Sequence, residues 1–342
     1  MPKFTFITIA YNEEAYLGQL LNDLKNQDYP HNDIEVILVD SASVDSTKDI
    51  MNSFYNDNDF SNCLVLNNPK KILAAGWNVA LEKATGEIIV KIDGHGRIDS
   101  DFLSNVAKEM DNGEDIVGGQ RVTVFEGEGS WSKILAHAEC SPFGSGVASY
   151  RRKCPKKYVK TLGHAAYKKS VFDTVGHFNE NFVRTEDNEI HYRMRKAGFK
   201  FCQCPDICSY LYARSSLKTM LKQKRGNGWW IGITFPHCPK CLSLYNFVPM
   251  AFVLALIFSF ALCAFCIIWP LIALLSAYFA AAFLATFLEI KKEPDKKLAF
   301  SMLILPALFF LMHFYYGLFT IFGIVYSPFF KINKEKIHEL RN

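Results

Sequence analysis

The sequence predicts an α/β domain with a doubly wound, mostly parallel sheet, followed by C-terminal amphipathic and transmembrane helices. Three observations support this fold class. Short apolar runs alternate with helical patterns through the first half of the chain, and polar turns follow the apolar runs. Two later tracts, 247–288 and 298–330, contain no Asp, Glu, Lys or Arg. Apolar strands separated by helices are typical of parallel sheets that are covered on both faces.

The predicted elements alternate along the chain. The predicted strands, most of them rich in Ile, Val, Leu and Phe, are Phe4–Ile9, Ile34–Val39, Leu64–Leu66, Ile88–Ile92 and Asp115–Val124. The helices have apolar residues at helical spacing and cover Glu13–Leu24, Ser46–Phe54, Ile72–Lys83, Trp131–Cys140 and Asp187–Lys196. Residues 141–150 are rich in Gly and Ser and predict a loop, and residues 151–157 predict a strongly basic one.

The soluble part is predicted to cover residues 1–214 and to lie in the cytosol. Met1–Ala10 resembles a first strand, because it lacks the basic region, apolar run and cleavage site of a signal peptide. A net charge of +4 is too small to indicate nucleic acid as a partner, and none is expected.

Residues 215–246 predict an amphipathic helix on the membrane surface and a linker. Its apolar face carries Leu217, Met220 and Leu221, interleaved with basic residues and followed by Trp229 and Trp230. Such helices lie at the interface between lipid and water. A surface helix packed on the soluble domain is the alternative.

Residues 247–330 predict a membrane-embedded region of two to three helices. Because one span needs about 20 residues, 247–288 suits two spans, whereas 298–330 is longer than one span and shorter than two. The loop 291–297 and the tail 331–342 are both basic, so the positive-inside rule places both in the cytosol. Either the last tract is re-entrant or in-plane, or the tail is an exception.

The ten cysteines leave two interpretations open. Cys238 and Cys241 have the spacing of a zinc-binding pair, and Cys202 with Cys204 could supply a second pair. Ordinary reduced thiols are the simpler interpretation for a cytosolic domain.

Polar turns follow three of the predicted strands: Ala10–Glu14, Asp40–Thr47 and Asp93–Arg97. Open α/β sheets bind ligands beyond the carboxyl ends of their strands, so we expect the three turns to converge on one site. The glycine spacing of dinucleotide-binding or Walker turns is missing there, which argues against NAD and ATP folds.

These motifs resemble family 2 glycosyltransferases. The turns read ITIAYNEE, VDSASVDST and IDGHG. The segments SPFGSGVASYRRK, GHAAYKKSVFDTVGHFNE and VRTEDNEIHYRMRKAG are similar to the succinoglycan-type subgroup of bacterial polysaccharide glycosyltransferases. The helix Leu217–Trp230 and the apolar tail also match that subgroup, so the resemblance covers essentially the whole chain.

The resemblance implies a GT-A nucleotide-diphospho-sugar transferase fold and an inverting transfer. The donor would be a UDP- or GDP-sugar, and the cofactor Mg²⁺ or Mn²⁺. The acceptor would be a polyprenyl-diphosphate-linked glycan in the synthesis of O-antigen, capsule or exopolysaccharide. The expected location is the bacterial cytoplasmic (inner) membrane, in contact with its lipid and with the catalytic domain facing the cytosol.

The resemblance also implies a metal site at Asp93-Gly94-His95. A carboxylate at the exit of a buried strand suits a hard cation, which neutralises the leaving diphosphate. The family usually has Asp at the third position, where this chain has His95. Imidazole binds Mn²⁺ but suits Mg²⁺ poorly, so either Asp93 alone anchors the metal or His95 assists it.

The first two turns are the expected nucleotide site. Asp40 is the expected contact to the base, whereas Asp45 is expected to cap the helix that follows it. The other expected nucleotide contacts lie on the same two turns and comprise Ala10, Tyr11, Asn12, Glu13 and Ser41, together with Gly94 from the third. For Asn12 and Glu13, stabilisation of a helix start is the alternative role.

Inversion needs a base that accepts the proton of the acceptor hydroxyl. The family's base maps to Asp187, and Glu186 is expected to support the acceptor or the structure. Without the resemblance, the simplest role for both residues is an acidic first turn that stabilises its helix.

Four further residues are expected at the acceptor or at the leaving diphosphate: His164, Gln223, Arg225 and Trp229. The match of 223–230 to the family's basic motif on this helix is partial. The basic loop 151–157 is an alternative contact for the acceptor pyrophosphate or anionic lipid, and a solvated loop is equally consistent with its charge.

Three other functions remain open. The first is transfer onto polyprenyl phosphate itself, and the long region 120–185 argues against so small an acceptor. The second is a processive synthase, for which the few apolar tracts make a poor channel. The third is a catalytically dead, membrane-bound protein that binds nucleotide sugars.

Overall fold

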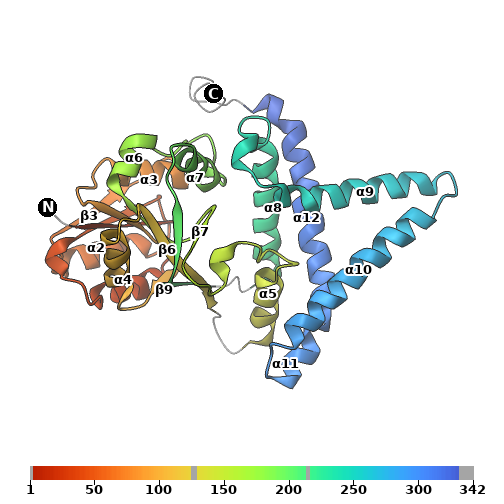
Figure 1. Ribbon diagram of the computed structural model, residues 1–342, viewed down its shortest axis with the longest axis horizontal. Coiled ribbons are helices and arrows are strands. Elements are labelled where there is room, and N and C mark those ends of the chain that lie inside the picture. Colours follow the sequence, from red (N-terminus) through yellow and green to blue (C-terminus); the bar gives the residue numbers. More distant parts are fainter. Residues whose placement is uncertain (1–2, 125–128, 213–215, 331–342) are drawn as a thin grey trace. The chain divides into compact units, whose positions relative to one another are not determined.

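The structure is a computed structural model that describes residues 3–124, 129–212 and 216–330 (Figure 1). The chain forms two compact units. The first, here the sheet unit, comprises Met1–Val124 and Ser149–Tyr212, and the second, here the helical unit, comprises Phe125–Ala148 and Ala213–Asn342. The predicted basic tail 331–342 lies outside the described residues.

The sheet unit is built on one mixed sheet. Its strands are β1 (Phe4–Ala10), β2 (Ile34–Asp40), β3 (Asn62–Asn67), β4 (Ile88–Lys91), β5 (Gly96–Ile98), β6 (Ile116–Val124), β7 (Lys157–Val159), β8 (Ala165–Lys168) and β9 (Phe201–Tyr212). Their order is β3-β2-β1-β4-β8-β6-β9-β5, and β7 pairs with β9. Strands β3, β2, β1 and β4 are parallel, as predicted, whereas β8 runs antiparallel to both β4 and β6.

Helices cover both faces of this sheet, which is why β1 and β2 are buried along their whole length. One face carries α1 (Leu17–Lys25), α2 (Thr47–Asn56) and α4 (Phe102–Asp111), and the other carries α3 (Leu73–Leu81), α6 (Lys169–Val175) and α7 (Glu186–Lys196). The leucines of α1 recur at i, i+3, i+4 and i+7, and this spacing places them on one buried face. The predicted α/β class is confirmed.

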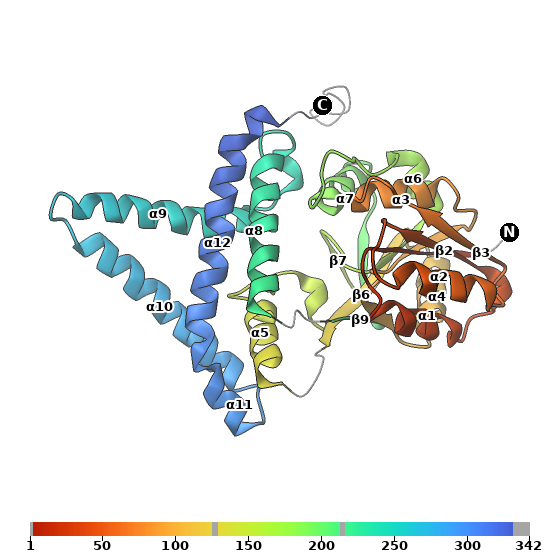
Figure 2. The same ribbon diagram turned by 180° about the vertical axis from the view of Figure 1, so that it is seen from behind.

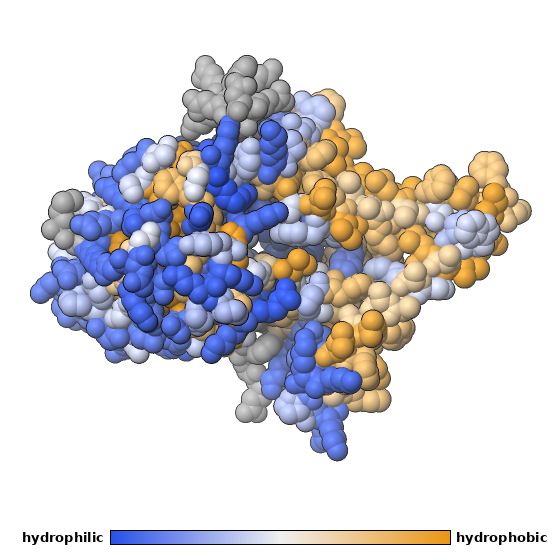
Figure 3. Space-filling view, viewed as in Figure 1, coloured by the Kyte–Doolittle hydropathy of each residue, from blue (hydrophilic) through white to orange (hydrophobic). Residues whose placement is uncertain are grey.

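The helical unit contains α5 (Ser130–Cys140), α8 (Leu217–Thr234), α9 (Val248–Cys263), α10 (Trp269–Ile290), α11 (Lys296–Ser301) and α12 (Leu305–Tyr326). Short 3₁₀ turns lie in the helical unit at Pro239–Cys241, Leu244–Phe247, Met302–Ile304 and Ser327–Phe329, and in the sheet unit at His31–Asp33 and Ser149–Arg151. Within the described residues, three helical runs are long and apolar enough to cross a membrane: Leu244–Cys263, Trp269–Ile290 and Lys296–Phe329. Figure 3 shows hydrophobic residues gathered over these helices. The last tract lies in one helical run of 34 residues, and whether this run crosses the membrane or lies in its plane stays a prediction.

Helix α8 packs along α12, and both views show the two helices side by side (Figures 1 and 2). The approach is close because Gly228 and Gly232 face it. A Cβ atom on these glycines would lie 2.2 Å from the Tyr316 carbonyl oxygen and 2.3 Å from that of Thr320. Small residues four apart let helix backbones approach closely, especially between apolar helices. The amphipathic pattern that predicted a surface helix does not reveal this partner.

Helix α5 belongs to the helical unit, although the sequence-based boundary at 214 includes it in the catalytic domain. Ile134, Leu135 and Ala138 form one apolar face of α5, which is buried against Leu305 and Phe309 of α12. An isolated amphipathic face does not specify which apolar surface will cover it, and here that surface comes from residues more than 150 positions later.

His137 connects α5 to the end of α10 through two carboxylates, and the strength of this connection is expected to depend on pH. Its Nδ1 lies 3.4 Å from Glu289 Oε2, and its Nε2 lies 3.2 Å from Glu293 Oε2. Hydrogen bonding to Glu289, and then to Glu293, raises the pKa of His137 despite its partial burial. Because the folded pKa is raised, this stabilisation is complete below the unfolded value of about 6.5 and is lost as pH rises through the folded pKa.

We therefore expect the melting temperature of the detergent-solubilised chain to fall as pH rises above about 6.5. His137→Ala should remove this dependence and cost about 1.5–3 kcal/mol at low pH, the range for hydrogen bonds to charged groups. His177→Ala removes an exposed imidazole and serves as the control. A pH dependence that survives in His137→Ala would contradict the assignment.

Candidate active site

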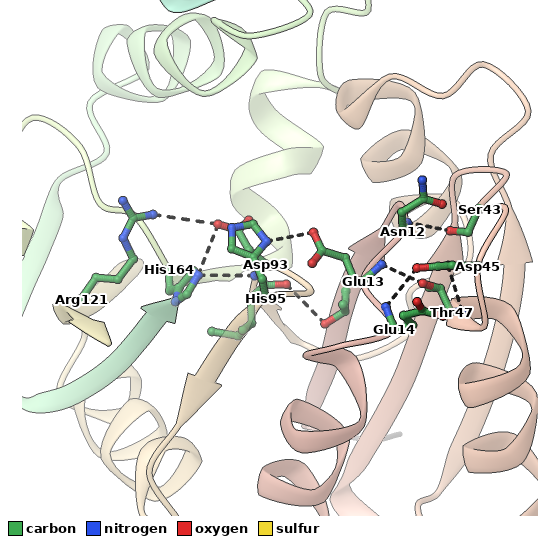
Figure 4. Close-up of polar contacts among 12 residues, drawn as sticks. Asn12, Glu13, Glu14, Ser43, Asp45, Thr47, Asp93, His95, Arg121 and His164 are labelled. Atoms are coloured by element: carbon green, nitrogen blue, oxygen red, sulfur yellow. Dashed lines mark hydrogen bonds and ion pairs between the residues drawn. The ribbon is translucent and has the colours of Figure 1, made fainter. Parts of the chain in front are cut away.

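The turns after β1 and β2 are hydrogen-bonded to each other (Figure 4). The Asn12 N–H donates to Ser43 Oγ at 3.1 Å, and Asn12 Oδ1 accepts from the Val44 N–H at 2.9 Å. Asn12 and Ala42 both have left-handed backbones, with φ values of 55° and 57°. Such conformations cost an alanine roughly 1–2 kcal/mol, so the cross-turn contacts hold a strained geometry of the kind found at ligand sites.

Asp45 accepts hydrogen bonds from backbone N–H groups near the start of α2, but the N-cap residue of this helix is Ser46, not Asp45 as predicted. Asp45 Oδ1 accepts from the Thr47 N–H at 3.0 Å and its Oδ2 from the Glu14 N–H at 3.2 Å. Asp40 is 2% exposed and its Oδ1 accepts from the Ser43 N–H at 3.0 Å. Asp40 therefore shapes the second turn, and its contact to a base stays a prediction.

The remaining expected nucleotide residues line the same edge. Ser41 Oγ accepts from the Asn68 side chain at 3.0 Å, which ties the second turn to the end of β3. Ala10 is 2% exposed and its carbonyl oxygen accepts from the Ser41 N–H at 2.9 Å, whereas Tyr11 is 51% exposed. The contact of either residue to a nucleotide stays a prediction.

The third turn, at the end of β4, joins the first. Glu13 Oε1 lies 3.0 Å from His95 Nδ1. A Cβ atom on Gly94 would lie 3.2 Å from both Ala10 Cβ and Glu13 Cγ, so only glycine fits there without displacing its neighbours. The predicted convergence of the three turns is therefore observed.

Asp93 lies between His164 and Arg121. Its Oδ2 is 3.3 Å from His164 Nε2 and 3.9 Å from Arg121 Nη1. Burial disfavours the carboxylate, but His164, Lys91 and His95 together hold the pKa of Asp93 well below its usual range. Burial lowers the pKa of His164, so this histidine is neutral at pH 7. His164, expected near the acceptor, is instead a neighbour of the predicted metal ligand.

Asp187, at the start of α7, pairs with Lys91 of β4. Lys91 Nζ lies 3.0 Å from Asp187 Oδ2, and the lysine side chain is only 4% exposed. Burial opposes its charge, but Asp187 and Asp93 outweigh this and raise the pKa of Lys91 above its ordinary value. Lys91 thus links the predicted base with the predicted metal ligand.

Glu186 lies in a different environment from its neighbour. Burial, followed by the charge of Asp187, raises the pKa of Glu186 to about 8, so its carboxyl group is mostly protonated at pH 7. Within the part of the chain that the structure describes, Glu186 Oε2 and Asp187 Oδ1 are buried without a hydrogen-bond partner. Buried oxygens without partners are rare in folded proteins and indicate a place for a ligand or water.

Helix α7 is held rigidly, and this positions Asp187. His191 lies 2.8 Å from Thr161 Oγ1 and 3.0 Å from the Tyr167 hydroxyl, and burial lowers its pKa to about 3. Glu189 accepts from Arg193 at 2.6 Å. Acidic residues in the first turn and basic residues in the last also complement the helix dipole.

Sequence reasoning missed Lys91 and Arg121. Lys91 lies within the predicted apolar strand 88–92, and a charge inside a buried strand signals a partner, because an unpaired one is costly. Its partner is 96 residues away and could not be identified from the sequence. Arg121 lies inside β6, within the predicted strand Asp115–Val124, and no local pattern distinguishes it from a residue of an ordinary half-buried strand.

The other expected acceptor residues lie on α8, in the helical unit. The Arg225 guanidinium is 4.8 Å from the Phe319 ring centroid, and the Trp229 ring is 5.2 Å from that of Tyr326. Gln223 Oε1 is buried without a partner among the described residues. In the basic loop, Lys156 pairs with Glu109 and Glu114, so part of its charge is already neutralised.

The residues present fit a divalent cation that takes most ligands from its substrate. No group of three or more His, Cys, Asp or Glu side chains within the described residues could hold a metal alone. Asp93 is ionised and 25% exposed, and His95 two residues later is 30% exposed. Mg²⁺ and Mn²⁺ commonly bind through one or two such side chains, with phosphates and water completing the shell.

Three features place the fold in the GT-A class of nucleotide-sugar transferases. They are the parallel half of the sheet, the hydrogen-bonded polar turns at its carboxyl edge, and the Asp93 turn. The chain belongs to glycosyl transferase family 2, whose model matches residues 5–176. It is therefore a glycosyltransferase.

Two curated relatives and one solved structure are similar to this chain. The transferase of Methanococcus voltae named dolichyl N-acetyl-alpha-D-glucosaminyl phosphate 3-beta-D-2,3-diacetamido-2,3-dideoxy-beta-D-glucuronosyltransferase is 26% identical over 65% of this chain and 71% of its own. The succinoglycan biosynthesis protein ExoA of Rhizobium meliloti is 28% identical over 64% of this chain and 65% of its own. The mannosyltransferase of Pyrobaculum calidifontis, solved with GDP-mannose and Mn²⁺, shares the fold over 97% of this chain and 88% of its own, with a TM-score of 0.57 and 18% identity.

Proposed function

We propose that this protein is an inverting transferase that moves a sugar from a UDP- or GDP-sugar to a lipid-linked glycan in the synthesis of a surface polysaccharide. The juxtaposition of Asp187 with Lys91 and the Asp93 turn carries the proposal, because it places a carboxylate beside the expected diphosphate site. The names of the relatives, which refer to dolichyl phosphate and to succinoglycan, support an acceptor of this class. The three apolar helices support membrane association. The cytosolic location of the sheet unit is part of the proposal.

The proposed reaction is a single displacement. The acceptor hydroxyl oxygen attacks the anomeric carbon, its proton passes to Asp187, and the bond from that carbon to the nucleotide diphosphate breaks on the opposite face. The protonated Glu186 stands next to the base without adding a second negative charge. Lys91 holds Asp187 in place through their 3.0 Å contact.

Asp93 and His95 would hold the cation. A bound Mg²⁺ or Mn²⁺ neutralises charge that develops on the leaving diphosphate. Arg121 and His164 hold the Asp93 carboxylate in its orientation.

The proposal is tested with the purified full chain, labelled UDP- and GDP-sugars, Mn²⁺ and a lipid-linked oligosaccharide extract, with mass spectrometry of the lipid product. We expect the sugar of one donor to be transferred, with inversion at its anomeric carbon. If the protein binds the donor but neither transfers the sugar nor hydrolyses the donor, it is catalytically dead. Transfer to polyprenyl phosphate alone would identify the smaller acceptor.

The metal prediction concerns Asp93 and His95. Asp93→Asn should raise the Mn²⁺ concentration needed for half-maximal donor binding by about tenfold or more, because it removes the one ionised ligand. His95→Ala should lower the preference for Mn²⁺ over Mg²⁺, since imidazole favours Mn²⁺. Calorimetric titrations with each cation measure both effects. An unchanged cation requirement in Asp93→Asn would remove this residue as a ligand.

A further inference from the structure

The helical unit contains an apolar pocket of about 380 Å³. Its walls come from the loop 142–147 and from α9, α10 and α12, and the aromatic part of its lining consists of Phe143, Tyr245, Phe252, Tyr278 and His313. This volume falls within the roughly 300–1,000 Å³ of small-ligand pockets. Val147 of the loop and Val248 of α9, both in the lining, are 44% and 64% exposed, so the pocket opens to the surface of the unit.

The polar groups of the lining largely satisfy one another. The Tyr278 hydroxyl lies 2.8 Å from His313 Nδ1, and His313 Nε2 lies 3.4 Å from the Gly144 carbonyl oxygen. A hydroxyl donor and a ring N–H donor account for both contacts. These residues therefore expose mainly aromatic ring faces and aliphatic carbon atoms to the pocket. A hydrocarbon is the ligand that suits such a wall.

Rigid aromatic walls define the shape of the pocket. The Phe252 and Tyr278 rings stack with centroids 4.4 Å apart, and Phe143 packs edge-on against His313 at 5.2 Å. Gly144 fixes the loop, because a Cβ atom there would lie 1.9 Å from the Ala138 carbonyl oxygen. Flat double bonds and branched methyl groups can lie against such rings with little loss of freedom, whereas a straight acyl chain must lose many rotamers.

A buried cation lies beside the same loop. Lys224 of α8 is 4% exposed, and its Nζ donates to Ser145 Oγ at 2.7 Å and lies 3.6 Å from Glu139 Oε1. Ser145 directly follows Gly144 of the pocket wall. The contact to Glu139 balances the charge of Lys224, so this buried pair fixes the loop that forms one wall of the pocket.

We propose that this pocket holds part of the isoprenoid chain of the polyprenyl phosphate that carries the acceptor. The inference rests on the proposed function for the identity of the lipid. The pocket would hold one part of this chain while the remainder of the chain stays in the bilayer.

Photolabelling of the full chain in detergent with diazirine-bearing undecaprenyl phosphate tests this pocket. We expect label on the peptides that contain 142–147 and 245–252, and competition by undecaprenyl phosphate but not by phosphatidylglycerol. Ala281→Phe fills the pocket from α10 and should lower labelling by about tenfold. Its matched control is Ala280→Phe, which adds the same ring at the neighbouring exposed position outside the lining.

Val248→Phe narrows the pocket from α9 and should reproduce the loss if Ala281→Phe proves unstable. Equal labelling of the Ala281→Phe and Ala280→Phe variants, or equal competition by phosphatidylglycerol, would overturn the proposal. The labelling needs neither donor nor transfer. Absent labelling with intact transfer to lipid-linked glycans would therefore refute the pocket alone, and intact labelling without any transfer would refute the proposed function alone.

Discussion

Asp187→Asn is expected to lower kcat for sugar transfer by about 10²–10⁴-fold, the range that a positioned general base contributes. The substitution is isosteric, and its amide oxygen can still accept from Lys91 at the present 3.0 Å separation. The variant should therefore fold and bind donor as the wild type does. What it loses is the ability to take the acceptor proton, so the loss should be confined to the chemical step.

Single-turnover kinetics and donor titration together measure this split. Asp173→Asn, at an exposed position on α6, makes the same chemical change away from the site and should retain full activity. Transfer by Asp187→Asn near the wild-type rate would remove Asp187 as the base. Loss of donor binding together with transfer would assign this residue to the donor site instead.

Lys91→Met is expected to have opposite effects on transfer and on metal binding. The ammonium of Lys91 holds Asp187 and also opposes a cation at Asp93, since its charge acts on both carboxylates. Removing it should lower kcat by roughly 10–100-fold, because a misplaced catalytic group is costly. It should also tighten Mn²⁺ binding by about tenfold, because one positive charge leaves the neighbourhood of the cation.

Lys168→Met provides the matched control. Lys168 of β8 pairs with Asp115 at 3.0 Å, the same separation, but both side chains are at least one-third exposed. An exposed ion pair contributes about 0–1 kcal/mol, so this variant should retain transfer, metal affinity and stability. A parallel fall of transfer and Mn²⁺ affinity in Lys91→Met would indicate a collapsed site rather than the electrostatic role described here.

The sequence by itself determined the parallel half of the fold and the place of the three polar turns. Apolar runs such as Ile34–Val39 and the amphipathic leucines of α1 specify local structure, because their periodicity matches one type of element. Parallel strands end at one edge of a sheet, so the turns at Asp40 and Asp93 had to converge. The membrane tract was equally predictable, since its length and lack of charge are local properties.

Only the tertiary structure decided which side chains meet across long separations. The Lys91–Asp187 pair depends on the docking of α7 over the sheet, and the contact of His164 with Asp93 depends on the antiparallel register of β8 against β4. The burial of α5 and the close packing of α8 on α12 likewise need surfaces from distant parts of the chain. A local pattern states that a face or a charge needs a partner, but the choice among many possible partners is made by packing, which no single segment encodes.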